Sequence, residues 1–196
     1  MRYLIICLFL LCSPYGFAQN AENINAYRKQ YIAELLADAR SPIKPSQVKF
    51  LDFFQPDEKY SVTADFVLSP GSKPFLINTH SGKQKPYKEY GQLKLKIGGN
   101  NLVLHVYQMV DFINDTAHKD YLFIPFNDKT NYVTTFAGGR YIDLKISDIK
   151  DGKLNLDFNK CYNPYCAYAD GYSCPIPPKE NSLDIEIPVG EKMFQH

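Results

Sequence analysis

The chain has 196 residues, of which 22 are Lys or Arg and 21 are Asp or Glu, so its formal net charge is +1. This near-neutral balance argues against nucleic acid or an anionic membrane as a partner, because either would favour a strongly basic face. The length suits a single domain. Tyrosine is abundant, with 15 residues, while tryptophan is absent.

Residues 1–18 are predicted to be a secretory signal peptide. Arg2 precedes an apolar run that ends at Cys12, and small residues occupy the −3 and −1 positions of a cleavage site before Gln19. The run is too short for a stable membrane span. Leu11 stands where a lipoprotein signal has a small residue, so we do not expect a lipid anchor at Cys12. The mature chain would be exported, periplasmic or secreted, with no transmembrane span.

Residues 19–40 are predicted to form an N-terminal helix that packs on the domain. Ser41-Pro42 should end this helix. Apolar side chains recur at steps of three and four residues, which is typical of an amphipathic helix. They are Ile24, Tyr27, Tyr31, Leu35 and Ala39.

From residue 48 onward the hydrophobic period changes to two, which predicts β-strands. The runs 93–97 and 102–106 flank Gly98-Gly99-Asn100 and should form a hairpin. Alternation that leaves one face wet favours an antiparallel sheet. We therefore expect residues 41–196 to form one mainly β domain, an antiparallel β-sandwich or a partly open barrel. The other expected strands are 60–68, 75–77, 121–126, 140–146, 154–158 and 183–187.

Residues 158–181 hold three cysteines and four prolines, and the prolines exclude a helix. Exported cysteines favour disulfides, and Cys166 and Cys174 flank a short turn that contains glycine. We expect this pair to bond and to stabilise the fold by roughly 2–3 kcal/mol. Cys161 would be a buried free thiol. Zinc is the weaker alternative, because no His lies nearby, and we predict neither a metal nor a cofactor.

One group of charged residues could work as a site: Arg140 with Asp128, Asp143 and Asp157. An Arg guanidinium binds a carboxylate or phosphate through two bonds, and paired carboxylates can share acid–base work. The strands carrying Asp143 and Asp157 are joined by a short turn, so we expect them to pair and to bring the two side chains together. The alternative, which we favour, is a structural Arg–Asp network that holds the turns.

Further side chains complete the candidate binding site. They are Thr130, Tyr141, Asn159, Tyr162, Asn163, Glu180 and Asn181. Exposed tyrosines on a β face can stack on sugars or line an apolar groove. His105 lies in mid-strand and is expected to be partly buried and satisfied. The sequence has no G-x-S-x-G, P-loop or HExxH motif, so the hydrolase, nucleotide-binding and metalloprotease classes that they mark lack positive support.

Several motifs in the C-terminal two-thirds of the chain resemble those of a known family. They are Phe123-Ile-Pro-Phe-Asn-Asp128, Gly138-Gly-Arg-Tyr-Ile-Asp143, Tyr162-Asn-Pro-Tyr-Cys166, Cys174-Pro-Ile-Pro-Pro-Lys-Glu-Asn181 and Gly190-Glu-Lys192. Together they resemble the uncharacterised bacterial family called domain of unknown function 1684. The resemblance implies a small β-rich domain, often exported, and implies no particular activity.

Two functions follow from these observations. The first is a monomeric exported β domain that is structural or binds a small molecule, a glycan or a protein. The second is a small hydrolase or lyase that uses Asp128, Arg140, Asp143 and Asp157. The sequence names neither a ligand nor a reaction.

Overall fold

The computed structural model describes the backbone of residues 15–195 and the side chains from residue 21 onward. Most of the predicted signal segment, residues 1–14 with Cys12, lies outside this range. One helix, α1, precedes seven strands. Their bounds are α1 Tyr15–Ala37, β1 Ser61–Leu68, β2 Phe75–Asn78, β3 Gln84–Ile97, β4 Asn100–Met109, β5 Tyr121–Phe126, β6 Arg140–Lys145 and β7 Lys153–Asp157. None of the described helices is long and apolar enough to cross a membrane.

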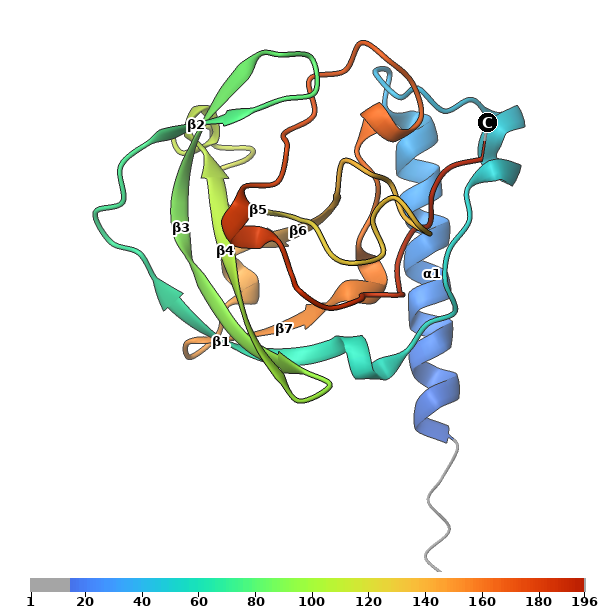
Figure 1. Ribbon diagram of the computed structural model, residues 1–196, viewed down its shortest axis with the longest axis horizontal. Helices are drawn as coiled ribbons and strands as arrows, with labels where there is room; N and C mark the ends of the chain where they lie inside the picture. The colour runs from blue at the N-terminus through green and yellow to red at the C-terminus, as the bar shows by residue number, and fades with distance from the viewer. Residues whose placement is uncertain (1–14, 196) are drawn as a thin grey trace, which may run out of the picture.

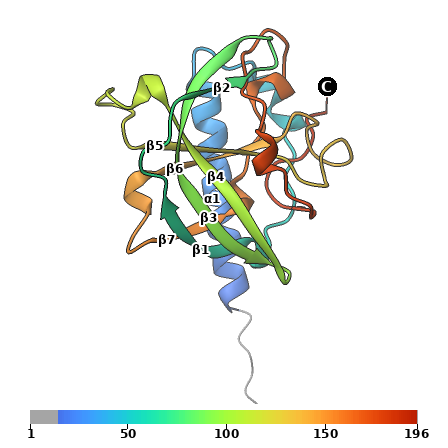
Figure 2. The same ribbon diagram turned by 60° about the vertical axis from the view of Figure 1, so that its left-hand side comes forward.

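The seven strands form a single antiparallel sheet in the order β6-β5-β4-β3-β1-β7, and β2 pairs with β3. The sheet curls into a half-barrel, and α1 runs along one side of it (Figures 1 and 2). The prediction of a mainly β, partly open barrel with an N-terminal helix is therefore confirmed.

The β3–β4 hairpin is the longest pairing in the sheet and lies where the sequence predicts it. Ile97 pairs with Asn100 across a turn in which Gly98 and Gly99 have φ angles of +54° and +89°. Both angles lie in the left-handed region that glycine adopts without a steric penalty. The Gly-Gly pair therefore sets the register of the hairpin.

The expected pairing of strands 140–146 and 153–158 is wrong. β7 pairs with β1, where Ser61 lies opposite Asp157, while β6 pairs with β5. The two strands thus occupy opposite ends of the strand order. Because the sheet curls, its two edges come near each other across the open side, and a short connection joins them without hydrogen bonding between the strands.

The expected strand at 183–187 is also wrong, although its burial pattern is as predicted. Leu183 and Ile187 are buried, whereas the segment itself is irregular. Its backbone pairs with a loop instead of the sheet: the Leu183 amide donates to the Asn127 carbonyl, and the Lys129 amide donates to the Ile185 carbonyl. Alternating apolar residues do not distinguish a strand that pairs with the sheet from a segment that pairs with a loop.

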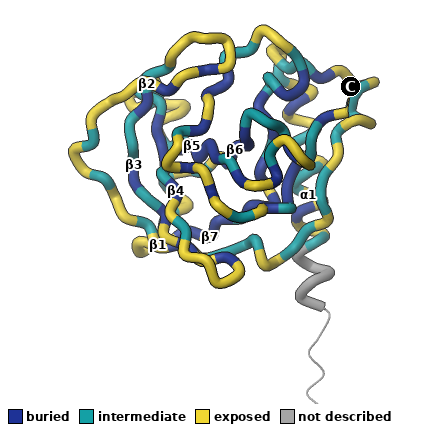
Figure 3. The backbone as a smooth tube through the Cα atoms, in the orientation of Figure 1, coloured by how far each residue is buried: buried dark blue, intermediate teal, exposed yellow. Residues whose placement is uncertain are grey.

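The sheet has a core on each face. The inner face holds the main aliphatic core, which includes Leu93, Leu104 and Ile124. Buried stretches recur along the strands of the sheet (Figure 3). The outer face carries a second, aromatic core that includes Phe123 and Tyr141. Part of residues 158–181, the cross-linked segment, packs against this core through Tyr162, Tyr165, Tyr172 and the Cys166–Cys174 pair, whereas Phe158 and Cys161 belong to the aliphatic core.

The predicted cysteine chemistry is confirmed. Cys166 and Cys174 form a disulfide with their Cα atoms 6.2 Å apart, while Cys161 is buried and free. The predicted apolar stripe of the helix is buried or partly buried from Ile24 to Leu35, but α1 ends at Ala37 and Ala39 is exposed beyond it. Leu35 packs with Tyr168 and Phe194, which joins α1 to the disulfide loop and the C-terminal segment.

Candidate functional site

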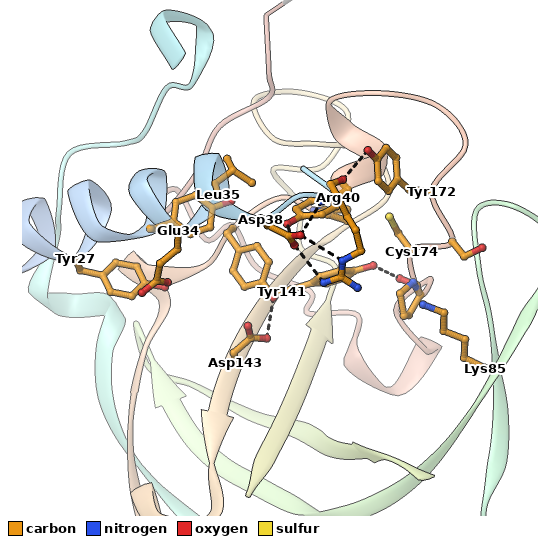
Figure 4. Close-up of a pocket in the computed structure, with 16 residues that line it drawn as sticks. Tyr27, Glu34, Leu35, Asp38, Arg40, Lys85, Tyr141, Asp143, Tyr172 and Cys174 are labelled. Atoms are coloured by element: carbon orange, nitrogen blue, oxygen red, sulfur yellow. Dashed lines mark hydrogen bonds and ion pairs between the residues drawn. The ribbon is translucent and has the colours of Figure 1, made fainter. Parts of the chain in front are cut away.

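A cavity of about 620 Å³ lies between α1, the cross-linked segment and β6 (Figure 4). Tyrosine is the most frequent residue in its walls. Six tyrosines line it, namely Tyr27, Tyr31, Tyr141, Tyr162, Tyr165 and Tyr172. Its charged residues are Glu34, Asp38, Arg40, Lys85 and Asp143. The described residues contain no group of three or more His, Cys, Asp or Glu side chains placed to hold a metal ion.

Regular structure brings these side chains together. Tyr27 and Tyr31 are four residues apart on α1 and so share one helix face. On β6, Tyr141 and Asp143 alternate with the inward residue Ile142, so both lie on the outer face that α1 covers. The Tyr31 ring lies 5.6 Å from the ring of Tyr162, which connects the helix to the cross-linked segment.

Asp143 is the central polar group of the cavity. Its Oδ1 atom accepts hydrogen bonds from the hydroxyls of Tyr121 at 2.7 Å and Tyr162 at 2.8 Å. No described residue donates to Oδ2, and no described Lys, Arg or His forms an ion pair with this carboxylate. Asp143 is solvent-exposed where it borders the cavity. Partial desolvation by the surrounding protein raises the pKa of Asp143, and the two hydroxyl bonds oppose that shift.

Glu191 lies behind the cavity wall and is only 1% exposed. It accepts hydrogen bonds from the Asn163 amide at 2.9 Å and from the Tyr168 hydroxyl at 2.6 Å. The Tyr31 hydroxyl lies 3.4 Å from the same carboxylate and so connects it to the cavity. Burial raises the pKa of Glu191 to about 7. The carboxylate has no cationic partner among the described residues.

Sequence analysis did not select Glu191. A Gly-Glu-Lys motif near the end of a chain gives no sign of a buried carboxylate. The available clue is Gly190, which has a φ angle of +78° and no space for a Cβ atom beside Cys161. That close packing places the following residue, Glu191, inside the protein.

Asp128 and Arg140 lie in the core and not in the cavity. The two side chains are fully buried, and Arg140 Nη2 lies 2.7 Å from Asp128 Oδ2. Arg140 also donates to the backbone carbonyls of Ile187 and Val189. Asp128 Oδ1 accepts from the amide and the hydroxyl of Thr130. The geometry is that of the structural Arg–Asp network considered above as the alternative to a site.

Asp157 lies on the opposite edge of the sheet from Asp143. Its Oδ1 atom accepts from the backbone amide and the side-chain amide of Asn159. A second cavity of about 450 Å³ is lined by both Asp143 and Asp157, together with Tyr27. The two carboxylates thus face a common space across the open side of the half-barrel, but no hydrogen bond joins them. The four charged candidates therefore do not converge at one centre.

The other candidates divide between the cavity and the interior. Tyr141 and Tyr162 line the cavity, whereas Glu180 is exposed and lies outside its lining. The remaining candidates are buried and hydrogen-bonded within the protein; they are Thr130, Asn159, Asn163 and Asn181. His105 is partly buried, and its Nδ1 lies 2.7 Å from Glu89 Oε2, as expected for a satisfied histidine.

Sequence analysis missed most of the cavity wall. Tyr27 and Tyr31 were selected only as helix residues facing a core, and Arg40 and Lys85 were not selected at all. These residues reach the cavity from α1, from the turn after it and from β3. Their convergence depends on contacts between distant parts of the chain, which no local pattern reveals.

Comparisons with known proteins support the fold and give no activity. None of the curated proteins compared with the chain matches it. One similar solved structure is the solution NMR structure of the uncharacterized protein from gene locus rrnAC0354 of Haloarcula marismortui. It is 30% identical, with a TM-score of 0.64, and the match covers 87% of this chain and 96% of that one. Residues 46–192 match the family described as "Protein of unknown function (DUF1684)", and the chain belongs to this family.

Proposed function

We propose that this protein binds a small molecule in the tyrosine-lined cavity, with Asp143 as the polar anchor. The observation that carries the proposal is a carboxylate that has no counter-ion among the described residues and is exposed to a cavity lined by tyrosine rings. The volume of about 620 Å³ falls within the range of small-molecule sites. Such sites combine mainly apolar walls with a few polar groups that orient the ligand.

We further propose that the protein works outside the cytoplasm, after removal of residues 1–18. The Cys166–Cys174 disulfide supports this location, because such bonds persist in oxidising compartments. The disulfide also holds one wall of the cavity, since Cys174 lines it. An oxidising environment would therefore help to maintain the binding site.

A thermal-shift screen tests the binding proposal. The purified protein would be screened with amines, carboxylic acids, neutral sugars and neutral aromatic compounds. A ligand at about 100 times its Kd stabilises a folded protein by about 2.7 kcal/mol, which raises the unfolding midpoint by several degrees. We expect the rise to disappear in Asp143→Asn and to persist in Asp184→Asn.

Asp184 provides a matched control because its side chain is 96% exposed, lies outside the cavity lining and pairs only with Lys129. Both substitutions remove one carboxylate and change the net charge equally. Hits that are indifferent to Asp143→Asn, or a screen without hits, would contradict the binding proposal.

A hydrolase or lyase is the second candidate function. The raised pKa of Asp143 favours it, since such shifts often mark acid–base groups. Asp128 and Arg140 do not line the cavity, so Asp143 would act without them. Incubating each screening hit with the protein and analysing it by mass spectrometry separates the two functions. Turnover that is lost in Asp143→Asn while binding remains would identify an enzyme.

A further inference from the structure

The six tyrosines of the cavity can offer a ligand their ring faces, because their hydroxyl groups are already hydrogen-bonded within the protein. Tyr27, Tyr141 and Tyr172 donate to the backbone carbonyls of Lys160, Pro175 and Arg40, respectively. Tyr162 and Tyr165 donate to the carboxylates of Asp143 and Asp38, and Tyr31 bonds with the Tyr168 hydroxyl and Glu191. A ligand would therefore meet aromatic surface on these walls and would find few hydrogen-bond donors.

The unused polar atom at the Asp143 end of the cavity is a negatively charged acceptor. Asp143 Oδ1 receives two hydroxyl bonds, which leaves Oδ2 without a donor among the described residues. Glu34 also lines this space, and its Oε1 accepts a bond from Gln30 at 2.8 Å. Burial and then the negative charge of Asp143 raise the pKa of Tyr27 and of Tyr162. Asp143 therefore contributes a negative potential at both rings.

The positive groups of the cavity do not neutralise Asp143. Arg40 pairs with Asp38 at 3.2 Å, and its side chain is 84% exposed. Lys85 lies well away from Asp143, beyond Arg40 (Figure 4). Tyr27 and Glu34 occupy the opposite end of the view (Figure 4). The cavity is thus polarised, and no described cation forms an ion pair with Asp143, although Lys160 Nζ lies 5.4 Å from the centroid of the Tyr27 ring.

Building on the proposed function, we infer that the ligand is an organic cation whose substituted ammonium group lies against the tyrosine rings and pairs with Asp143. Ring faces attract cations, most strongly where water is excluded, and aromatic cages commonly bind quaternary ammonium groups. The ligand would supply the counter-ion that the fold leaves out. A neutral sugar could donate to Asp143 but would leave its charge without a counter-ion, and Asp143 would repel an anion.

Matched pairs of probes test the charge directly. Choline and phenyltrimethylammonium would be titrated by calorimetry, each beside its neutral tert-butyl isostere, 3,3-dimethylbutan-1-ol and tert-butylbenzene. Each pair has nearly the same shape and differs in charge. We expect each cation to bind at least about 10-fold more tightly than its isostere. Asp143→Asn should reduce that ratio to near one, whereas Asp184→Asn should preserve it.

A second pair of variants tests the rings. Tyr27→Phe retains the ring, and Tyr27→Leu removes it; both lose the long hydroxyl bond to the Lys160 carbonyl. We expect cation affinity to fall several-fold in Tyr27→Leu and to be nearly unchanged in Tyr27→Phe. The unfolding midpoint of each variant, measured by circular dichroism, shows whether its fold is retained.

The outcomes distinguish the ligand class from the binding function. Equal affinity for cations and isosteres, or no binding of any probe, overturns the inference of a cationic ligand. Asp143-dependent hits of another class in the thermal-shift screen would still leave the binding function in place. Binding of the cations that is equally strong in Asp143→Asn overturns the pairing with Asp143.

Discussion

Asp128 and Asp143 are carboxylates from neighbouring parts of the chain, yet the fold gives them opposite surroundings. Asp128 is buried with Arg140 at 2.7 Å and accepts further bonds from Thr130 and the Ile187 amide. Asp143 receives two tyrosine hydroxyls, has no cationic partner within the part of the chain that the structure describes, and opens into a cavity. The first carboxylate is neutralised by the fold, whereas the second is not.

This difference separates structural polar groups from groups that can serve a ligand. A buried ion pair whose charges neutralise each other inside the protein has no charge left for a ligand, and breaking it by removing one partner destabilises the fold. A carboxylate that is partly shielded from water and has no counter-ion destabilises the folded state. A ligand that supplies a positive charge removes that destabilisation when it binds. The following changes test this contrast, from the largest expected effect to the smallest.

The substitution Arg140→Met should have the largest effect on stability. It leaves Asp128 as a buried charge without a partner, and breaking such a pair lowers the free energy of unfolding by about 3–5 kcal/mol. Urea denaturation followed by circular dichroism measures this loss. A decrease below about 1 kcal/mol would mean that the pair does not hold the core.

Glu191 should produce a distinctive pH dependence. In the unfolded chain the carboxyl loses its proton near its ordinary pKa of 4.5, whereas in the folded protein it retains the proton up to about pH 7. Between these values the folded state binds more protons, so stability falls as pH rises, by on the order of 3 kcal/mol in total.

The substitution Glu191→Gln should flatten that pH dependence, because glutamine does not titrate. Urea midpoints measured from pH 4.5 to pH 7 in both proteins provide the comparison. An unchanged slope in the variant would assign the pH dependence to another group, with Asp143 the next to test, since its pKa is also raised.

Removing the disulfide should have an intermediate effect. Replacing both Cys166 and Cys174 with serine opens a short loop, which lowers the free energy of unfolding by about 2–3 kcal/mol in the chain-entropy model.

The free thiol of Cys161 provides a separate test of burial. Burial raises the pKa of this thiol to about 11, so iodoacetamide should label it only after unfolding. Rapid labelling of the folded protein would contradict its buried position.

The smallest effect is expected at the surface pair of Lys129 and Asp184. The atoms Nζ and Oδ1 lie 2.8 Å apart, but the side chains are 55% and 96% exposed. Exposed pairs contribute about 0–1 kcal/mol, so Lys129→Ala should change the urea midpoint little. A loss as large as that of Arg140→Met would show that distance matters more than burial here.

Local patterns predicted the fold better than they predicted strand pairing. The β3–β4 hairpin follows from alternation around Gly98-Gly99, and α1 follows from apolar spacing. The position of β7 beside β1 depends on how far the whole sheet curls, which short-range periodicity does not specify. Sequence proximity to β6 was therefore misleading.

The site was predictable only in part. Asp143 and Tyr162 were among the candidates, because each stands in a polar, aromatic context on a predicted outer face. Asp128 and Arg140 belonged to the same group, since sequence alone does not report burial. The cavity walls supplied by Tyr31 and Lys85 depend on helix docking and sheet curvature, and neither property leaves a local pattern.

A single comparison tests the distinction between the two carboxylates most directly: the free energy of unfolding of Asp128→Asn and of Asp143→Asn, measured in urea under identical conditions. We expect Asp128→Asn to lose about 3 kcal/mol or more, because Arg140 is left buried without its counter-ion. Asp143→Asn should stay within about 1 kcal/mol of the original protein or exceed it, because it removes a carboxylate that has no cation. Equal losses in the two variants, or the reverse order, would contradict the assignment of Asp128 to the core and of Asp143 to a binding site.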